Sequence, residues 1–299
     1  MKKNKLAGTP LVIIATAFWA TGGIFITQVI KGSNLTPINL AFWRDISTFA
    51  VLFLGVSILR PALLRVKKSD LPWLIGMGII SIGLFHALWN TSIMLNGMAV
   101  ATVLQCYAPI FVTIIAKVIW KERLSYFKIL AIILSTLGTI LIVNVKGLDG
   151  IIITPIGLFV GLISAFAYGS VSLFGKKLSG NYSHWTILTY AFGVGTLTLL
   201  PLQLLSPSAS LLPVILPFAE LIFITTLSGY LLYFAGLQKL PASVASILST
   251  AEVPFAAFMA YLFMGEELTG WQIVGAVFVV GGVILLSLKN KANRNLRVE

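Results

Sequence analysis

The amino-acid sequence predicts an all-α integral membrane protein in which ten transmembrane helices form two inverted five-helix repeats around a central cavity, with both termini cytoplasmic. Three observations support this fold class: apolar runs recur along the whole chain, basic residues cluster in alternate connections, and the second half of the chain repeats the first. Of the 299 residues, 58% are hydrophobic and only 10% are charged, whereas a soluble domain has about 25% charged residues. With a mean hydropathy of +0.99, the chain needs a bilayer as its solvent.

Ten apolar runs are long enough to cross a bilayer, since a spanning helix needs about 20 mostly apolar residues. The first run follows the basic stretch MKKNK and so imitates a signal peptide. It exceeds the usual signal core of about 7–15 residues and no small-residue cleavage site follows it, so we interpret it as a retained helix. The connections are too short to hold a soluble domain. The expected spans are 9–30, 38–59, 71–93, 98–120, 124–145, 154–175, 185–205, 213–236, 241–264 and 268–288.

Basic residues are distributed unevenly between the two sides of the membrane. With a cytoplasmic N-terminus, seventeen Lys and Arg residues fall on the cytoplasmic side, and only Lys31 and Lys146 fall on the other side. Cytoplasmic loops carry the excess of Lys and Arg, so we predict that both termini are cytoplasmic. The net charge of +12 is then a topology signal, and not the water-facing basic patch of a nucleic-acid-binding protein. The seventeen residues are Lys2, Lys3, Lys5, Arg60, Arg65, Lys67, Lys68, Lys121, Arg123, Lys128, Lys176, Lys177, Lys239, Lys289, Lys291, Arg294 and Arg297.

The second half of the chain repeats the first at a shift of 144 residues. The shift places AVATVL (99–104) on SVASIL (243–248), and ERLSYFKI on EELTGWQI. Chance matches between apolar runs are common, but shared Pro, Glu and Gly positions in the same order are not. We therefore predict two units, 1–148 and 149–299. Because five helices is an odd number, the second unit enters the membrane from the other side, which relates the units by a pseudo-two-fold axis in the membrane plane.

The end of each half resembles the EamA repeat of the drug/metabolite transporter superfamily. The stretches are APIFVTIIAKVIWKERLSYFKILAIILSTLGTILIV and AEVPFAAFMAYLFMGEELTGWQIVGAVFVVGGVILLS, and YLLYFAGLQKLPASVASIL and ATAFWATGGIF are similar to the preceding junction and to the opening helix of that repeat. The first half departs from the family pattern, because Trp120-Lys121-Glu122 stands where Gly265-Glu266 keeps Gly-Glu. The resemblance implies a ten-helix carrier of small metabolites, often an exporter of amino acids or related compounds.

Polar residues inside the apolar spans are candidates for a binding site, because they normally face the bundle interior or a water-filled cavity. In the ninth span, Ser246, Ser249 and Glu252 follow at steps of three and so form one polar face. Pro254 leaves the Thr250 carbonyl without its usual helical partner, which favours a kink there. A neutral acid, or a helix–helix hydrogen bond without a role in transport, is the alternative for this carboxyl group.

Arg44 lies about two turns inside the second span and is followed by Asp45. An arginine facing lipid at this depth is costly, so Arg44 either snorkels outwards or enters the cavity. In the cavity it would pair with Glu252 or hold a carboxylate of the cargo bidentately. We expect Glu252 to lie near Arg44, His86 or both, and Asp45 to neutralise a neighbour.

In the third span, His86 and Asn90 lie one turn apart with Trp89 beside them. Histidine titrates near neutral pH, so His86 is a candidate for binding protons or cargo. A buried histidine that is satisfied by a backbone carbonyl is the alternative.

Two further pairs correspond between the halves. Gln105 in the fourth span matches Ser249 at the 144-residue shift, and Tyr107 follows it with a ring and a hydroxyl. Trp19 in the first span corresponds to Tyr168 in the sixth, so these aromatic residues either line the cavity or only pack helices together. The predicted binding or cavity-lining residues are Trp19, Arg44, His86, Trp89, Asn90, Gln105, Tyr107, Tyr168, Ser249 and Glu252.

Three classes of function compete. A secondary active transporter, expected to be an exporter, would work by alternating access at a midplane site, with Glu252 or His86 as the proton carrier. A polytopic membrane enzyme would need clustered carboxylates for Mg²⁺ or several polar groups near one surface, and the sequence has no such cluster. A passive channel would show neither saturation nor counterflow. We favour the transporter and expect no enzyme activity; the sequence also has no GxxxxGK[ST] motif for ATP.

The predicted partners are a small-molecule substrate and the lipid bilayer, without nucleic acid, cofactor or metal. Ten helices can enclose a complete pathway, so a monomer suffices, with a dimer as the alternative. The predicted location is the cell membrane, as a multi-pass protein of the cytoplasmic membrane of a prokaryote. The single cysteine, Cys106, rules out an intrachain disulfide.

Overall fold

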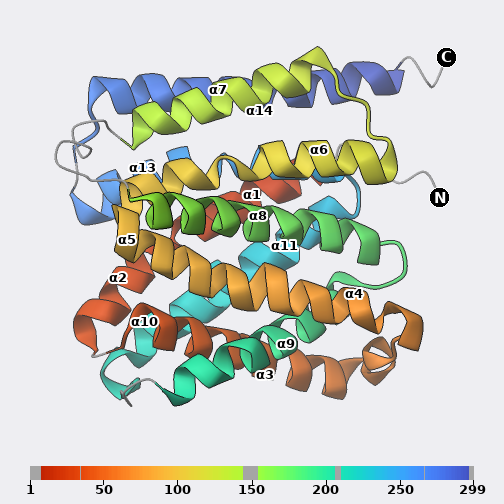
Figure 1. Ribbon diagram of the computed structural model, residues 1–299, viewed down its shortest axis with the longest axis vertical. Coiled ribbons are helices and arrows are strands. Elements are labelled where there is room, and N and C mark those ends of the chain that lie inside the picture. Colours follow the sequence, from red (N-terminus) through yellow and green to blue (C-terminus); the bar gives the residue numbers. More distant parts are fainter. Residues whose placement is uncertain (1–7, 34, 144–153, 206–209, 266, 296–299) are drawn as a thin grey trace.

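The computed structural model describes residues 8–33, 35–143, 154–205, 210–265 and 267–295, and within these ranges all regular secondary structure is helical. The long helices lie side by side as a bundle (Figure 1). In this part of the chain, nine helices are long and apolar enough to cross a membrane, and the shorter apolar helix Tyr126–Ile142 adds a tenth. The predicted ten-helix membrane protein is confirmed. The cytoplasmic location of the termini stays a prediction, and so do the two units, whose boundary falls outside the described residues.

Several spans consist of consecutive helical segments, because a break or a π-helical stretch interrupts them. In the first half the segments are α1 (Gly8–Ala20), α2 (Gly22–Gly32), α3 (Pro37–Leu59), η2 (Pro61–Leu64), η3 (Lys68–Asp70), α4 (Leu71–Gly76), η4 (Met77–Leu84), α5 (Phe85–Gln105), α6 (Ala108–Trp120) and α7 (Tyr126–Ile142). In the second half they are α8 (Pro155–Leu178), α9 (His184–Leu204), η6 (Leu212–Val214), α10 (Ile215–Glu220), η7 (Leu221–Ser228), α11 (Gly229–Leu237), α12 (Ala242–Ser249), α13 (Glu252–Met264) and α14 (Gly270–Asn295). The segments η4 and η7 are π-helical.

Side-chain caps determine where four of the long helices begin. Thr36, Ser125, Thr154 and Ser183 each precede a helix, and each side chain accepts a hydrogen bond from the backbone N–H three residues on. Such a cap satisfies one of the donors that the first helical turn leaves without a partner. Pro37 occupies the first position of α3, where its missing N–H costs nothing.

The 144-residue shift found in the sequence also holds for the bounds of the helices. Adding 144 to the bounds of α4, η4 and α6 gives those of α10, η7 and α13, and the starts of α5 and α7 give those of α11 and α14. Lys121 and Gly265, the left-handed residues that end α6 and α13, are also 144 apart, with φ of 52° and 69°. Apolar composition alone does not determine where helices break, so this correspondence supports the prediction of two related units.

The fourth and ninth spans both break just before a proline. The chain passes from α5 to α6 at Cys106–Tyr107, and from α12 to α13 at Thr250–Ala251. Pro109 and Pro254 lack the N–H that would bond the carbonyl four residues earlier, and the preceding turn tightens to hydrogen bonds between residues three apart. The kink predicted at Thr250 is confirmed.

The helices α7 and α14 pack against each other along their length and form one edge of the bundle (Figure 1). Glycines let their backbones touch. A Cβ atom on Gly138 would lie 2.9 Å from the backbone nitrogen of Val279, and one on Gly275 would lie 2.9 Å from that of Ile142. Small residues are what allow helices in a membrane to approach this closely.

Candidate binding cavity

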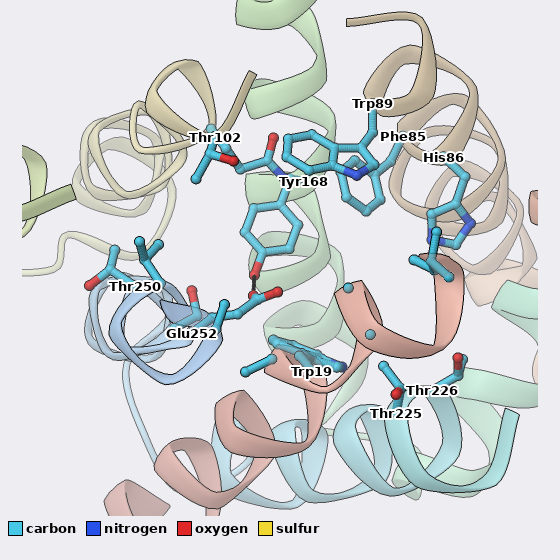
Figure 2. A pocket seen from close by; sticks show the side chains of 18 of the residues that line it. Trp19, Phe85, His86, Trp89, Thr102, Tyr168, Thr225, Thr226, Thr250 and Glu252 are labelled. Atoms are coloured by element: carbon cyan, nitrogen blue, oxygen red, sulfur yellow. Dashed lines mark hydrogen bonds between the residues drawn. The ribbon is translucent and has the colours of Figure 1, made fainter. Parts of the chain in front are cut away.

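A cavity of about 470 Å³ lies inside the bundle where the broken helices meet. Small-molecule sites typically have volumes of about 300–1,000 Å³, so the cavity has the size of a metabolite site. Its wall is built from both halves of the chain, by α1, α2, α3, α5 and α6 and by α8, η7, α11, α12 and α13. Figure 2 shows the side chains that point into it. The polar and aromatic members are Trp19, Thr27, Arg44, Phe85, His86, Trp89, Thr102, Gln105, Cys106, Tyr168, Thr225, Thr226, Tyr230, Ser249, Thr250 and Glu252.

Eight of the ten residues predicted from the sequence lie on this wall, and Asn90 and Tyr107 do not. Each of these two follows a residue that does line the cavity, Trp89 and Cys106, and one step along a helix turns a side chain by about 100°. The Tyr107 side chain is accordingly 40% exposed. The eight are Trp19, Arg44, His86, Trp89, Gln105, Tyr168, Ser249 and Glu252.

Glu252 is the first residue of α13, directly after the break at Thr250–Ala251. Its Oε2 accepts a hydrogen bond of 3.4 Å from the Tyr168 hydroxyl of α8, the dashed line in Figure 2. A carboxylate at a helix N-terminus is also favoured by the helix dipole. Among the ion pairs of the described residues, none joins Glu252 to Arg44 or His86. The expected proximity is therefore replaced by a contact with Tyr168, because His86 lies on the opposite side of the cavity (Figure 2).

The opposite wall carries a buried charged cluster. Asp45 of α3 is fully buried; its Oδ2 lies 2.8 Å from His86 Nδ1, and its Oδ1 lies 3.5 Å from Arg44 Nε. Asp45 thus places a negative charge beside Arg44 and orients the His86 ring through its Nδ1 atom. Arg44 keeps 17% of its side chain accessible and lines the cavity. Of the two alternatives for Arg44, the structure shows the cavity-facing one.

Aromatic rings line the cavity between the two charged walls. The Trp19 ring centroid lies 5.2 Å from that of Tyr230, 5.0 Å from that of Tyr233 and 6.5 Å from that of Tyr168. Phe85 packs at 5.2 Å from Tyr168. Tilted and edge-on ring pairs contribute about 0.5–1.5 kcal/mol each beyond the area that they bury. The Trp19–Tyr168 pair expected from the repeat is therefore part of a packed aromatic group on the cavity wall.

Two hydroxyl pairs join the halves next to these aromatic residues. Thr21 Oγ1 lies 2.8 Å from Thr225 Oγ1, and Ser81 Oγ lies 2.6 Å from Ser170 Oγ. Ser81 and Thr225 are 144 residues apart, and Thr21 and Ser170 each follow their aromatic residue by two positions. The pairs are equivalent in the two halves, and each satisfies hydroxyl groups that have little or no access to water.

Several cavity-lining residues were not predicted, among them Tyr230, Thr225, Thr226 and Phe85. Tyr230 lies 144 residues beyond His86, so applying the shift to His86 would have identified it. The same shift relates Thr225 to a serine of the third span. Phe85 gives no comparable signal, because an aromatic residue in an apolar run usually only packs against its neighbours.

Comparison with known proteins agrees with the resemblance seen in the sequence. The sequence model of the EamA-like transporter family matches residues 6–144 and 155–288. An uncharacterized transporter of Archaeoglobus fulgidus is 27% identical, over 93% of this chain and 98% of its own length. The uncharacterized inner membrane transporter YicL of Salmonella typhimurium is 28% identical, over 94% and 95%. A solved crystal structure with 15% identity matches 95% of this chain and 98% of its own with a TM-score of 0.82, so it shares the fold.

Proposed function

Since this chain belongs to the EamA-like transporter family, we propose that it is a secondary active transporter that exports small metabolites such as amino acids or related organic compounds. The cavity is the observation that carries this proposal. It is large enough for a metabolite, both halves of the chain build it, and it has charged groups on two opposing walls. Alternating access then means that the two half-bundles rock around this site and expose it to each side in turn.

The two walls suit the two ends of a zwitterion. Arg44 presents a guanidinium group to the cavity, and such a group binds a carboxylate through two parallel hydrogen bonds. Glu252, on the other wall, suits an ammonium group. The aromatic side chains between them, Trp19 and Tyr168 among others, would pack against an apolar body. This arrangement supports amino acids and their relatives as the cargo class.

Glu252 and His86 are the candidates for coupling transport to protons. Each borders the cavity, and taking up a proton changes the charge of either residue by one unit. Ionisable groups inside a membrane protein commonly form such proton relays. His86 is held by a carboxylate, whereas within the described ranges Glu252 has a single side-chain hydrogen bond, from a tyrosine. The weaker hold on Glu252 favours it as the group that exchanges protons.

Counterflow in liposomes tests the proposal. Purified protein is reconstituted into vesicles loaded with unlabelled amino acids and related metabolites, and entry of the labelled counterparts is followed at two pH values. We expect saturable counterflow with the native chain, a loss of about tenfold or more in Glu252→Gln, as for a group that binds cargo directly, and no change in Glu267→Gln, whose side chain is exposed. A pH dependence that disappears in Glu252→Gln identifies Glu252 as the coupling residue.

Two outcomes would contradict parts of this proposal. Counterflow that persists in Glu252→Gln with an unchanged pH dependence would remove Glu252 from the site and leave it as a packing residue. Labelled cargo that enters without saturation, and without any need for internal cargo, would indicate a channel.

A further inference from the structure

Of the helix α12, only the last residue, Ser249, lines the cavity. Beyond the helix breaks the cavity continues along α2 and α13, where Ala256 and Ala260 line it. On the other side of the breaks lies α12, whose residues Ala242–Ser249 are all buried. The equivalent stretch of α5, 144 residues earlier, is more open, since Thr102 and Gln105 are partly exposed and line the cavity. The two equivalent stretches therefore differ in exposure. The helix α12 begins beside the connection between α6 and α7, which lies at the right in Figure 1, and ends at the cavity wall with Ser249.

A cluster of polar groups binds the N-terminal end of α12. Glu122 lies in the connection between α6 and α7, where Ser125 caps α7. Glu122 Oε1 accepts the backbone N–H of Ala242 at 2.9 Å, and its Oε2 accepts from Lys128 Nζ at 3.2 Å and from the Ser243 hydroxyl. Lys128 Nζ also donates to Ser243 Oγ at 2.7 Å. The connection between α6 and α7 is thus bonded to the first residues of α12.

These bonds are well placed to hold α12. The residue before the helix is Pro241, which offers no side-chain cap, so the Glu122 carboxylate satisfies a donor that α12 cannot satisfy itself. The side chains of Lys128 and Glu122 are only 10% and 13% accessible, and removing one member of a buried pair leaves the other charge uncompensated. With eight residues, α12 is about 12 Å long. A shift at its N-terminal end therefore also moves Ser249, at its C-terminal end in the cavity wall.

We propose that Glu122, Lys128 and Ser243 form a latch that keeps the cavity closed at the α6–α7 end, and that its opening lets α12 move and exposes the cavity there. The inference rests on the proposed alternating access and adds to it residues that do not touch the cavity. The three side chains come from both predicted units, so the latch joins the parts that would have to move apart.

Cysteine accessibility tests the latch without knowledge of the cargo. Cys106 is the only cysteine of the chain, so Ala256→Cys in a Cys106→Ser background gives one reporter thiol in the cavity. A membrane-impermeant maleimide is applied to intact cells and to inverted vesicles. With the latch intact, we expect labelling from one side only. In Glu122→Gln and in Lys128→Met, labelling from the second side should rise about tenfold, which corresponds to about 1.4 kcal/mol.

Lys117→Met is the matched control, because Lys117 is an exposed lysine in the last turn of α6. Like Lys128→Met, it removes one positive charge at the α6–α7 end of the bundle, but labelling of the reporter cysteine should stay one-sided. Ser243→Ala removes a hydroxyl alone and should give a smaller rise, which keeps the test valid if the charge variants do not reach the membrane.

The proposal would be overturned if the reporter cysteine were labelled from both sides, or from neither side, with the latch intact. It would also be overturned if labelling from the second side did not rise in any of the three latch variants. If the native chain shows counterflow while those variants stay one-sided, the latch is wrong and the carrier stands. Increased labelling from the second side in the variants supports the latch, whichever cargo the protein carries.

Discussion

Asp45 and Glu252 are both carboxylates inside membrane-spanning helices, yet their surroundings differ. Asp45 is fully buried, forms a hydrogen bond with His86 and lies within ion-pair distance of Arg44. Removing two ions from water costs several kcal/mol per ion, and only well-placed partners compensate for this. Glu252 has one hydrogen bond of 3.4 Å and borders the cavity. At the scale of residues, Asp45 therefore suits a structural role, and Glu252 suits exchange with cargo, water or a proton.

Asp45→Asn should lower the free energy of unfolding by about 3 kcal/mol, the lower end of the range for breaking a buried ion pair. Arg44 loses its counter-ion, while the shape of the side chain at position 45 is unchanged. Thermal unfolding in detergent measures the effect, with Glu267→Gln expected to change stability by no more than about 0.5 kcal/mol. The double variant Arg44→Leu with Asp45→Leu should be more stable than Asp45→Leu alone. If it is less stable, the two residues do not act as a pair.

The residues found from the sequence alone were those that stand out locally. Glu252 is conspicuous as an acid within an apolar run, and Trp19 and Tyr168 were identified through the repeat. The partners were harder to foresee, because they depend on how helices pack. Glu122 bonds to Ala242, which is 120 residues away, and no local pattern relates the two. Apolar runs specify spans, but they do not specify which faces of those spans meet.

At the scale of elements, backbone contact rather than side-chain bulk joins α7 to α14. Gly138→Ala should lower the free energy of unfolding by about 1–3 kcal/mol, the usual cost of adding atoms to a well-packed interface, because the new Cβ would meet the Val279 backbone. Gly55→Ala is the control, since a Cβ there meets nothing within 4 Å, and it should raise stability by about 0.5–1 kcal/mol by favouring the helix. Thermal unfolding of both variants in detergent measures this; equal effects would show that α7 and α14 have room to move apart.

The ten spans and the kink before Pro254 follow from the sequence, because length, hydropathy and proline act locally. The π-helical segments do not. In η7, the hydroxyls of Thr226 and Ser228 donate to carbonyls five residues earlier, Leu221 and Phe223. Thr and Ser occur in many α-helices, so their presence does not predict a wider turn. Packing against neighbouring helices determines whether a turn is α-helical or π-helical, and this packing involves residues that are distant in the sequence.

At the scale of the whole molecule, the distribution of basic residues predicts which end of the bundle faces the cytoplasm. Lys31→Cys, in the last turn of α2, and Ser69→Cys, in η3, test this at exposed positions before and after the second span, each in a Cys106→Ser background. On intact cells, an impermeant maleimide should label Lys31→Cys and leave Ser69→Cys unlabelled until the membrane is inverted, since basic loops are cytoplasmic. The reverse pattern would invert the topology, and with it the side that the latch closes.

The π-helical segments η4 and η7 have one further consequence. Each has eight residues, each begins 144 residues from the other, and each leads directly into a helix that carries cavity residues, His86 in α5 and Tyr230 in α11. Their hydrogen bonds join residues five apart, so each wide turn holds more residues than an α-helical turn would. Deleting one residue from a regular α-helix rotates everything that follows by about 100°, but in a π-helical stretch it removes the surplus residue and lets the wide turn close to an α-helical one. A single codon removed in η4 or η7 would therefore leave His86 or Tyr230 on the cavity side, which makes these segments the places where the spans tolerate a deletion best.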